Sequence, residues 1–571
     1  MKKGLLITIF LSVVFVFAVA VWYSPIIFKG YPTQGISQDA LLARNYHETE
    51  VLAVHDNQTI LISSNLVKEE GRSLLMSQRL RSFFFAKIFD VIGVLDYNNL
   101  ILLSIILYAL ALVLFTILVL ELFNLKVAIA FSLIYIFSPI GWGLSRSLAA
   151  YEFCLIFWAL FFIFYFLGVK KTQQSQNKFN NLFFIISGIF LTFSALSREV
   201  ALVFALAFFV FLVIKKLKGS QASGQQLLYV FIPFAILLII FWLPSFLSGE
   251  NRYVSMVTGR ETEESKSLAQ MHVFPDPYTY YFEKEEFLEK FRSKNLGWTE
   301  NLQTRKDLTN FGFEKISLFQ RAKVGSYILF QHVSRFFSLE DFGGPFILLL
   351  WILGMAYLKK RSAFLYKLFI YWLGISLFIF SFVIFASRDH LMDFLWLIVL
   401  GIILGLFYIL QIVKNHFQIE GKRAFILDVI AIGLVLYHLV LVNHVVLGRQ
   451  YDKDSVPRSM AYTQEIKKFE IKDAEVIAIP GDFPNQDTTL NYLTNKSFVI
   501  FRSSTLNKLL EEGKIKQALE AFRVKYILGY SDKLSNELTA KAGVINIAPN
   551  SLKIDMGEIS EGKSFFMNII R

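Results

Sequence analysis

The chain contains eleven long apolar runs, and these limit its possible folds more than any other feature. About 20 apolar residues at about 1.5 Å per residue cross the hydrocarbon of a bilayer as a helix. The runs lie at residues 5–22, 100–122, 127–143, 148–168, 182–197, 199–214, 226–247, 345–358, 366–386, 391–413 and 424–447. Because backbone groups in lipid must bond to one another, the runs predict an α-helical polytopic membrane protein with about 11 transmembrane helices.

The composition argues against a soluble fold. The 571 residues are 55% hydrophobic and 18% charged, whereas soluble domains average about 45–50% apolar and about 25% charged. The one cysteine, Cys154, lies in an apolar run, so a disulfide or a cysteine metal site within one chain is excluded. The first run is longer than the usual core of about 7–15 residues in a signal peptide. We interpret residues 1–22 as a retained helix, with cleavage as the alternative.

The Lys and Arg residues are concentrated in alternate connections between the predicted spans. These connections carry Lys2, Lys3, Lys126, Lys170, Lys171, Lys178, Lys215, Lys216, Lys218, Lys359, Lys360, Arg361, Lys367, Lys414, Lys422 and Arg423. The other short turns hold one basic residue each, namely Arg146, Arg198 and Arg388. Because positive loops stay in the cytoplasm, this pattern predicts a multi-pass protein of the cell inner (plasma) membrane with a cytoplasmic N-terminus. The net charge of +12 is then explained by the basic residues of the cytoplasmic connections, and we predict no nucleic-acid partner.

With this orientation, the large segments between and after the spans lie outside the cytoplasm. We predict a transmembrane body at 1–449, with outer loops at 23–99 and 248–344, and an extracytoplasmic domain at 450–571. In the last domain, helical patterns alternate with strand-like runs at 474–479, 498–501, 524–528 and 544–548. This alternation predicts a small α/β domain.

Ionisable residues near the predicted outer face are the candidates for function. A charge at the middle of a bilayer costs about 2.5–3.5 kcal/mol on insertion scales, so such residues are at an edge, paired or functional. The candidates are Asp39, Arg146, Glu152, Arg198, Arg388 and His390. Each single Arg also has a structural explanation, because an Arg at a helix end extends its charge to the lipid headgroups.

Asp39 opens a helix-like stretch in the first outer loop. Helical spacing would put Ala43 and His47 on its face, with Tyr46 adjacent, so Tyr46 and His47 are possible substrate contacts. A carboxylate can remove a proton from a hydroxyl, and Arg side chains can hold a phosphate. Together these residues suit a lipid-anchored phosphate donor and a polar acceptor.

Four stretches resemble the GT-C superfamily of membrane glycosyltransferases, particularly bacterial protein mannosyltransferases and aminoarabinose transferases. The stretches read SQDALLARNY, SQRLRSFFFAKIFDVIG, SRSLAAYEFCLIFWAL and SRDHLMDFLW. The resemblance implies transfer of a sugar from a polyprenyl-phosphate donor, with inversion, to a glycan, lipid or protein acceptor. It implies Asp39 and Glu152 as catalytic residues, and Arg388 and Arg198 as contacts of the donor phosphate.

The chain also departs from the family pattern. Ala40 stands where the family has Glu, and Glu152 stands where Asp is more usual. Without a WWDYG-like motif, an oligosaccharyltransferase is disfavoured. No strong metal-ligand cluster occurs, so we name no certain cofactor, with a divalent cation as an open alternative.

Two other functions stay open. A transporter or flippase of lipid-linked substrates would usually show repeats, broken helices and charges at the bilayer midplane. A non-catalytic envelope protein could keep the GT-C fold without the chemistry, as the missing Glu after Asp39 allows. For catalysis, we expect the Asp39 carboxylate within about 15 Å of the Arg388 guanidinium, a rough allowance for acceptor, sugar and a clamped phosphate.

Overall fold

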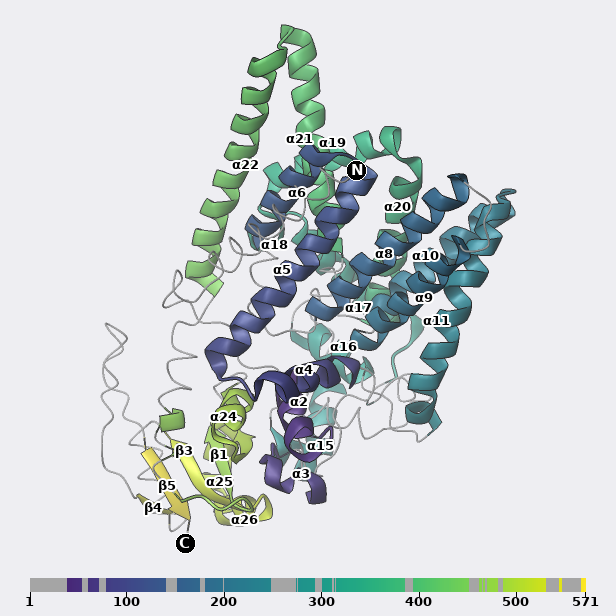
Figure 1. Cartoon of the computed structure of the whole chain (residues 1–571). Helices are drawn as coiled ribbons and strands as arrows, with labels where there is room; N and C mark the ends of the chain where they lie inside the picture. Colours follow the sequence, from purple (N-terminus) through teal and green to yellow (C-terminus); the bar gives the residue numbers. More distant parts are fainter. Residues whose placement is uncertain are drawn as a thin grey trace. The chain divides into compact units, whose positions relative to one another are not determined.

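The computed structural model of the chain divides into two compact units (Figure 1). The described residues are 38–53, 60–70, 79–139, 151–174, 180–198, 200–247, 274, 276–292, 300–310, 313, 315–385, 394–450, 462–464, 466–467, 470–480, 486–529, 544–546 and 566–570. The membrane unit comprises Met1–Tyr31, Asn98–Pro244 and Ser317–Tyr451. The loop unit comprises Pro32–Tyr97, Ser245–Ile316 and Asp452–Arg571.

The membrane unit consists of helices. They are α5 (Tyr97–Leu122), α6 (Leu125–Phe137), α8 (Tyr151–Gln174), α9 (Asn180–Ser197), α10 (Val200–Leu217), α11 (Gln221–Leu247), α17 (Leu318–Arg335), α18 (Leu339–Phe342), α19 (Pro345–Arg361), α20 (Ala363–Phe378), the π-helix η2 (Ile379–Val383), α21 (Leu395–Phe417) and α22 (Gly421–Gln450). Within the described part of the chain, eight helices are long and apolar enough to cross a membrane. The polytopic helical fold is therefore confirmed.

Each predicted span from 100–122 onward overlaps a helix within the described residues. Three of these helices are shorter than a full span. Helix α6 has 13 residues, α19 has 17 and ends in Lys359, Lys360 and Arg361, and α20 has 16 but continues into η2. The predicted first span at 5–22 lies outside the described residues. The apolar runs predicted the positions of these helices, because so many consecutive apolar residues must be buried in lipid or in a helical bundle.

Aromatic rings fill the core of the membrane unit. The ring centroids of Phe204 and Trp372 are 4.3 Å apart, and those of Phe162 and Trp396 are 4.9 Å apart. Trp158 meets Trp372 edge to face at 5.4 Å. These rings come from α8, α10, α20 and α21, so much of the Phe and Trp content packs helix against helix.

Glycines let α19 and α21 approach closely. A Cβ on Gly354 would lie 1.7 Å from the carbonyl oxygen of Gly401, and a Cβ on Gly405 would lie 1.9 Å from that of Leu350. Gly401 and Gly405 form a G-x-x-x-G pair on α21, the spacing that lets transmembrane backbones touch. Side chains at these positions would force the two helices apart.

The loop unit combines short helices with one sheet. Its helices are α2 (Gln38–Thr49), α3 (Ser64–Glu70), α4 (Arg79–Ile92), α14 (Pro277–Phe282), α15 (Lys284–Arg292), α16 (Glu300–Asn310), α24 (Gln486–Thr494), α25 (Ser503–Glu511) and α26 (Ile515–Ala521). The described strands are β1 (Val476–Pro480), β2 (Ser497–Phe501), β3 (Val524–Gly529), β4 (Val544–Asn546) and β5 (Phe566–Ile570), in the order β2-β1-β3-β5-β4.

The sheet is parallel on one side and antiparallel on the other. Strand β1 runs parallel to β2 and β3, while β5 is antiparallel to β3 and β4. The predicted strands correspond to β1 to β4, and β5 was not predicted. The predicted alternation of strands and helices in the C-terminal segment is therefore present in the structure.

Residues of the first and second predicted loops complete the core of this sheet. Ile60, Ile62 and Val67 pack in one buried cluster with Tyr278 and with sheet residues such as Val499. Leu61 also pairs antiparallel with Phe498, with backbone hydrogen bonds of 2.9 and 2.7 Å. The loop that carries Asp39 is thus built into the same hydrophobic core as the C-terminal strands.

Candidate functional site

Asp39 is a buried carboxylate paired with Arg81. It lies in the first turn of α2, where the helix dipole favours negative charge. It is only 6% exposed, and Arg81 of α4 is 2% exposed. The Arg81 guanidinium forms an ion pair with the Asp39 carboxylate, and the Ser82 hydroxyl lies 3.5 Å from Asp39 Oδ1. Buried charges need such partners because their removal from water is costly.

Sequence reasoning missed Arg81. It lies within SQRLRSFFFAKIFDVIG, one of the four stretches that carry the family resemblance, but nothing local separates it from Arg79 or Lys87. Only the packing of α2 against α4 selects Arg81 as the partner of Asp39. Ala43 and Ala86 are fully buried in these helices, and small side chains allow such close packing.

Tyr46 and His47 lie near the other end of α2. His47 is eight residues after Asp39, about 12 Å along the helix axis. Its Nδ1 lies 2.7 Å from Asp90 Oδ1, and Lys87 Nζ donates to Asp90 Oδ2 at 2.6 Å. The hydrogen bonds from Lys87 and then His47 lower the pKa of Asp90. Lys87 Nζ also lies 5.9 Å from the centroid of the Tyr46 ring. These residues form an exposed polar cluster separate from the Asp39–Arg81 pair.

Arg44 joins α2 to the C-terminal helix α24. Its Nη1 donates to the carbonyl oxygens of Asn491 and Tyr492 at 2.8 and 3.0 Å, and its Nη2 donates to Asn491 Oδ1 at 3.0 Å. These two carbonyls belong to the last turn of α24, where helical donors run out, although the Asn491 carbonyl also accepts from the backbone N–H of Asn495 at 2.8 Å. Burial lowers the pKa of Arg44 to about 10. A buried guanidinium thus satisfies the end of one helix and holds the helix that carries Asp39.

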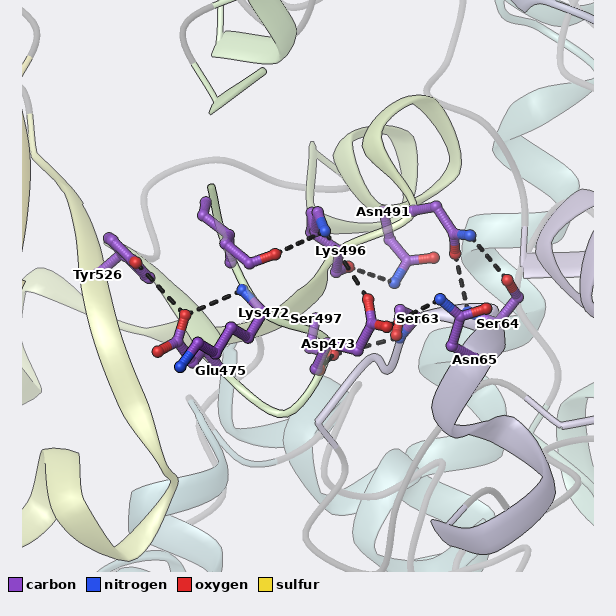
Figure 2. Close-up of polar contacts among 12 residues, drawn as sticks. Ser63, Ser64, Asn65, Lys472, Asp473, Glu475, Asn491, Lys496, Ser497 and Tyr526 are labelled. Carbon is purple, nitrogen blue, oxygen red and sulfur yellow. Dashed lines mark hydrogen bonds and ion pairs between the residues drawn. The ribbon is translucent and has the colours of Figure 1, made fainter. Parts of the chain in front are cut away.

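A second polar contact anchors the same loop farther along (Figure 2). Asn495, which follows α24 and has a left-handed φ of 52°, accepts from the backbone N–H of Ser64 at 2.8 Å and donates to the Ser64 hydroxyl at 2.7 Å. Asn65 donates to Asp473 Oδ2 at 2.8 Å. The residues before and after the 54–59 segment are therefore both attached to the C-terminal domain, which fixes α2 within the loop unit.

Glu152 is a buried carboxylate in the membrane unit. It lies in the first turn of α8 and is 1% exposed. The Ser104 hydroxyl of α5 donates to Glu152 Oε1 at 2.5 Å. Its burial beside a polar hydroxyl, inside a bundle of aromatic residues, is typical of an ionisable group kept for a function.

Arg198 lies near the same end of α8. Its guanidinium carbon is 3.5 Å from the centroid of the Tyr151 ring, and its Nη2 donates to the Tyr151 hydroxyl. Tyr151 directly precedes Glu152 and was not predicted. Cys154 Sγ and Ser194 Oγ, 3.3 Å apart, confirm that α8 and α9 are in contact here. Two predicted site residues of the membrane unit therefore gather around Tyr151.

Arg146, Arg388 and His390 lie outside the described residues. The expected proximity of Asp39 and Arg388 therefore stays a prediction. The chain leading to Arg388 is described as far as Phe385. There Arg321 of α17 donates to the carbonyl oxygens of Phe382 and Val383 at 3.2 and 2.9 Å. These carbonyls lie at the end of η2, and such π-helical turns occur frequently at functional sites.

Among the described residues, no group of three or more His, Cys, Asp or Glu side chains could hold a metal ion. Glu152 accepts a hydrogen bond from the Ser104 hydroxyl, and Asp39 contacts the Arg81 guanidinium and the Ser82 hydroxyl. A buried carboxylate beside a hydroxyl or a guanidinium can accept a proton or bind a polar group.

The units together define a multi-pass membrane protein that carries a helical and α/β loop unit. Among solved structures, the chain is similar to the Archaeoglobus fulgidus oligosaccharyltransferase in complex with zinc and sulfate. The TM-score is 0.55, at 12% identity over 93% of this chain and 70% of that chain. It is also similar to the oligosaccharyltransferase AglB from Archaeoglobus fulgidus in complex with an inhibitory peptide and a dolichol-phosphate. That alignment has a TM-score of 0.50, at 10% identity over 92% of this chain and 69% of that chain.

ArnT from Cupriavidus metallidurans bound to undecaprenyl phosphate aligns over 99% of this chain and 98% of that chain, at 9% identity. Its TM-score of 0.40 is too low to support a shared fold by itself. No protein-family model and no curated protein matches the sequence. The fold of the chain is GT-C-like, as the resemblance of its motifs predicted. At these identities the likeness concerns the fold and not the substrates.

Proposed function

We propose that the protein is a GT-C glycosyltransferase that moves a sugar from a polyprenyl-phosphate donor to an extracytoplasmic acceptor, with inversion. The observation that carries this proposal is a buried carboxylate, Asp39, at the start of the first-loop helix in a chain with a GT-C-like fold. AglB, which shares the fold, was solved with a dolichol-phosphate, a polyprenyl phosphate. This supports a donor of that class.

The proposed reaction is a single displacement at the anomeric carbon of the sugar. The acceptor hydroxyl oxygen forms the new bond to this carbon while the bond from the carbon to the phosphate oxygen breaks. The phosphate leaves with the electron pair, and the hydroxyl proton goes to the Asp39 carboxylate. Arg388 and Arg198 hold the phosphate, so the negative charge that grows on the leaving group is stabilised.

The neighbouring residues have supporting roles in this proposal. The positive charge of Arg81 favours the ionised form of Asp39, which is the form that can accept a proton. Glu152, oriented by Ser104, aligns the acceptor or holds a divalent cation. Tyr46 and His47 contact a part of the substrate about 12 Å beyond Asp39, while Arg146 and His390 are further candidate contacts.

We also propose that the loop unit faces away from the cytoplasm. The support comes from the charges at the helix ends, because α10 ends with Lys215 and Lys216 and α19 ends with Lys359 to Arg361. Positive loops stay in the cytoplasm. The acceptor is then a glycan, lipid or protein outside the cytoplasm.

The test compares transfer from a radiolabelled polyprenyl-phosphate sugar pool by the purified wild-type protein and four variants. A general base contributes about 10²–10⁴-fold to rate, so Asp39→Asn is expected to lower transfer at least a hundredfold while donor lipid still binds. Arg388→Ala is expected to weaken donor binding as well, because it removes a phosphate contact. Glu48→Gln is the matched control, since Glu48 is an exposed carboxylate on the same helix and its loss should leave transfer unchanged.

Arg81→Gln separates the catalytic role of Asp39 from a structural one. It breaks the same ion pair but keeps the carboxylate. We expect residual transfer, with the acid limb of the pH–rate profile moved to higher pH, because loss of the neighbouring cation disfavours the ionised carboxylate. Full transfer by Asp39→Asn would refute the mechanism. A wild-type protein that binds no polyprenyl phosphate would favour a transporter or a non-catalytic protein.

A further inference from the structure

The membrane unit contains a cavity of about 350 Å³ whose lining includes none of the candidate site residues described above. It is formed by the turn between α5 and α6, the end of α19, the end of α21 and the first turns of α22. Three cationic side chains line it, Lys126, Arg361 and Lys414, together with one carboxylate, Asp428. All four come from different helices, so the folded unit builds the cavity.

Asp428 organises this cavity. It is 3% exposed, although it lies in an apolar helix. Its Oδ2 accepts from the Lys126 ammonium, and its Oδ1 accepts from Lys414 Nζ at 2.5 Å. A buried carboxylate holding two ammonium groups from two other helices fixes the positions of those groups in advance, which lowers the cost of binding a ligand there.

The cavity keeps a positive excess after this pairing. Each ammonium has three N–H donors, and the ion pair with Asp428 uses one of them. Arg361 adds a planar guanidinium that can hold two phosphate oxygens at once. Asn415 and Gln411 add side-chain amides to the lining. The arrangement suits an anion with several oxygen atoms, such as a phosphate ester.

The surroundings of the cavity are apolar. Phe407 lines it, 4.9 Å from Lys126 Nζ to the ring centroid. Close by on α21 and α22, Ile412, Phe425 and Ile426 are more than half exposed on helices that cross the membrane. A soluble phosphate would leave these side chains unused, whereas acyl chains would cover them. Basic pockets between transmembrane helices are typical sites for anionic lipid headgroups.

We propose that this cavity binds the phosphate headgroup of an anionic glycerophospholipid, such as phosphatidylglycerol, from the leaflet at this end of the helices. The positive-inside pattern predicts that this leaflet is the cytoplasmic one. Arg361, Lys126 and Lys414 contact the phosphate, and the acyl chains follow the exposed faces of α21 and α22. The proposal does not rest on the glycosyltransferase reaction.

The experiment uses the full-length protein in detergent and native mass spectrometry with three probes: phosphatidylglycerol, phosphatidylcholine of the same chain length, and glycerol 3-phosphate. Wild-type protein is expected to retain phosphatidylglycerol most strongly. Each basic residue near a membrane surface contributes roughly a fivefold effect on binding of anionic lipid. Arg361→Gln and Lys126→Gln are therefore each expected to weaken phosphatidylglycerol binding about fivefold.

Arg423→Gln is the matched control. It removes the same charge from an exposed position on α22 that does not line the cavity, so lipid binding should stay at the wild-type level. Equal binding of phosphatidylglycerol by Arg361→Gln, Lys126→Gln and Arg423→Gln would overturn the site. Equal retention of phosphatidylcholine and phosphatidylglycerol would show that the site does not select an anionic headgroup, which would contradict the proposal. Glycerol 3-phosphate binding as tightly as the lipid would show that the ligand is a free phosphate ester and would overturn the lipid proposal.

Discussion

Replacement of Arg44 by Met is expected to destabilise the loop unit by about 2–5 kcal/mol. The guanidinium makes three hydrogen bonds to α24, and bonds to charged groups contribute about 1.5–3 kcal/mol each. Burial opposes them, because it lowers the pKa of Arg44 to about 10, a cost of about 3 kcal/mol. Met avoids this cost but leaves the carbonyls of Asn491 and Tyr492 without this donor. The free energy lost with the hydrogen bonds therefore exceeds the free energy gained by removing the buried charge.

The assay is thermal unfolding of the purified protein, followed by intrinsic fluorescence, with limited proteolysis of residues 38–53 as a local readout. We expect the midpoint to fall by roughly 5–15 °C and cleavage near α2 to accelerate. Arg502→Met is the matched control, because Arg502 is an exposed residue of the same unit. Equal midpoints for the Arg44 and Arg502 variants would refute the role of Arg44 as the link between α2 and α24.

Two further predictions concern topology and packing. A Cys introduced at Glu300 should be labelled by a membrane-impermeant maleimide in intact cells. Labelling of a Cys at Ser175, with protection at Glu300, would instead invert the proposed orientation. The native Cys154 is fully buried and should give little background. Gly405→Ala should lower the free energy of unfolding by about 1–3 kcal/mol, because its Cβ would lie 1.9 Å from the Leu350 carbonyl oxygen. In thermal melts it should unfold at a lower temperature than Gly433→Ala, whose Cβ would have no atom within 4 Å. Equal melting of the two glycine variants would contradict the close contact of α19 and α21.

The fold could be predicted from sequence where a local pattern decides the structure. The long apolar runs marked α5 and the later spans because a run of about 20 apolar residues has few other solutions. Strands β1 to β4 followed from short apolar runs between turns. Strand β5 was missed because nothing near Phe566 and Ile570 distinguishes it from the end of any apolar segment, and its pairing with β3 depends on the whole sheet.

The candidate site shows the same limit. Asp39 stood out because a lone carboxylate opens a helix-like stretch after a predicted span. Its partner Arg81 and the anchor Arg44 did not, since each is one basic residue among several and its partner is set by tertiary packing. Arg44 bonds to residues 447 and 448 positions away. No local period or spacing carries such information, and the contact becomes visible only when the first loop joins the C-terminal domain.

A double substitution of the Asp39–Arg81 pair distinguishes a structural role of Asp39 from a catalytic one. Replacing a buried ion pair with apolar residues of similar volume is often neutral or stabilising, because two charges no longer have to leave water. We therefore expect the double variant Asp39→Leu/Arg81→Met to unfold near the wild-type temperature, whereas Asp39→Leu alone, which leaves a buried guanidinium, should lose about 3–5 kcal/mol. If the pair serves only to hold α2 on α4, the stable double variant keeps its sugar transfer. If Asp39 removes the proton from the acceptor hydroxyl, the double variant is folded but inactive. Sugar transfer measured together with the melting curve therefore decides between the two roles.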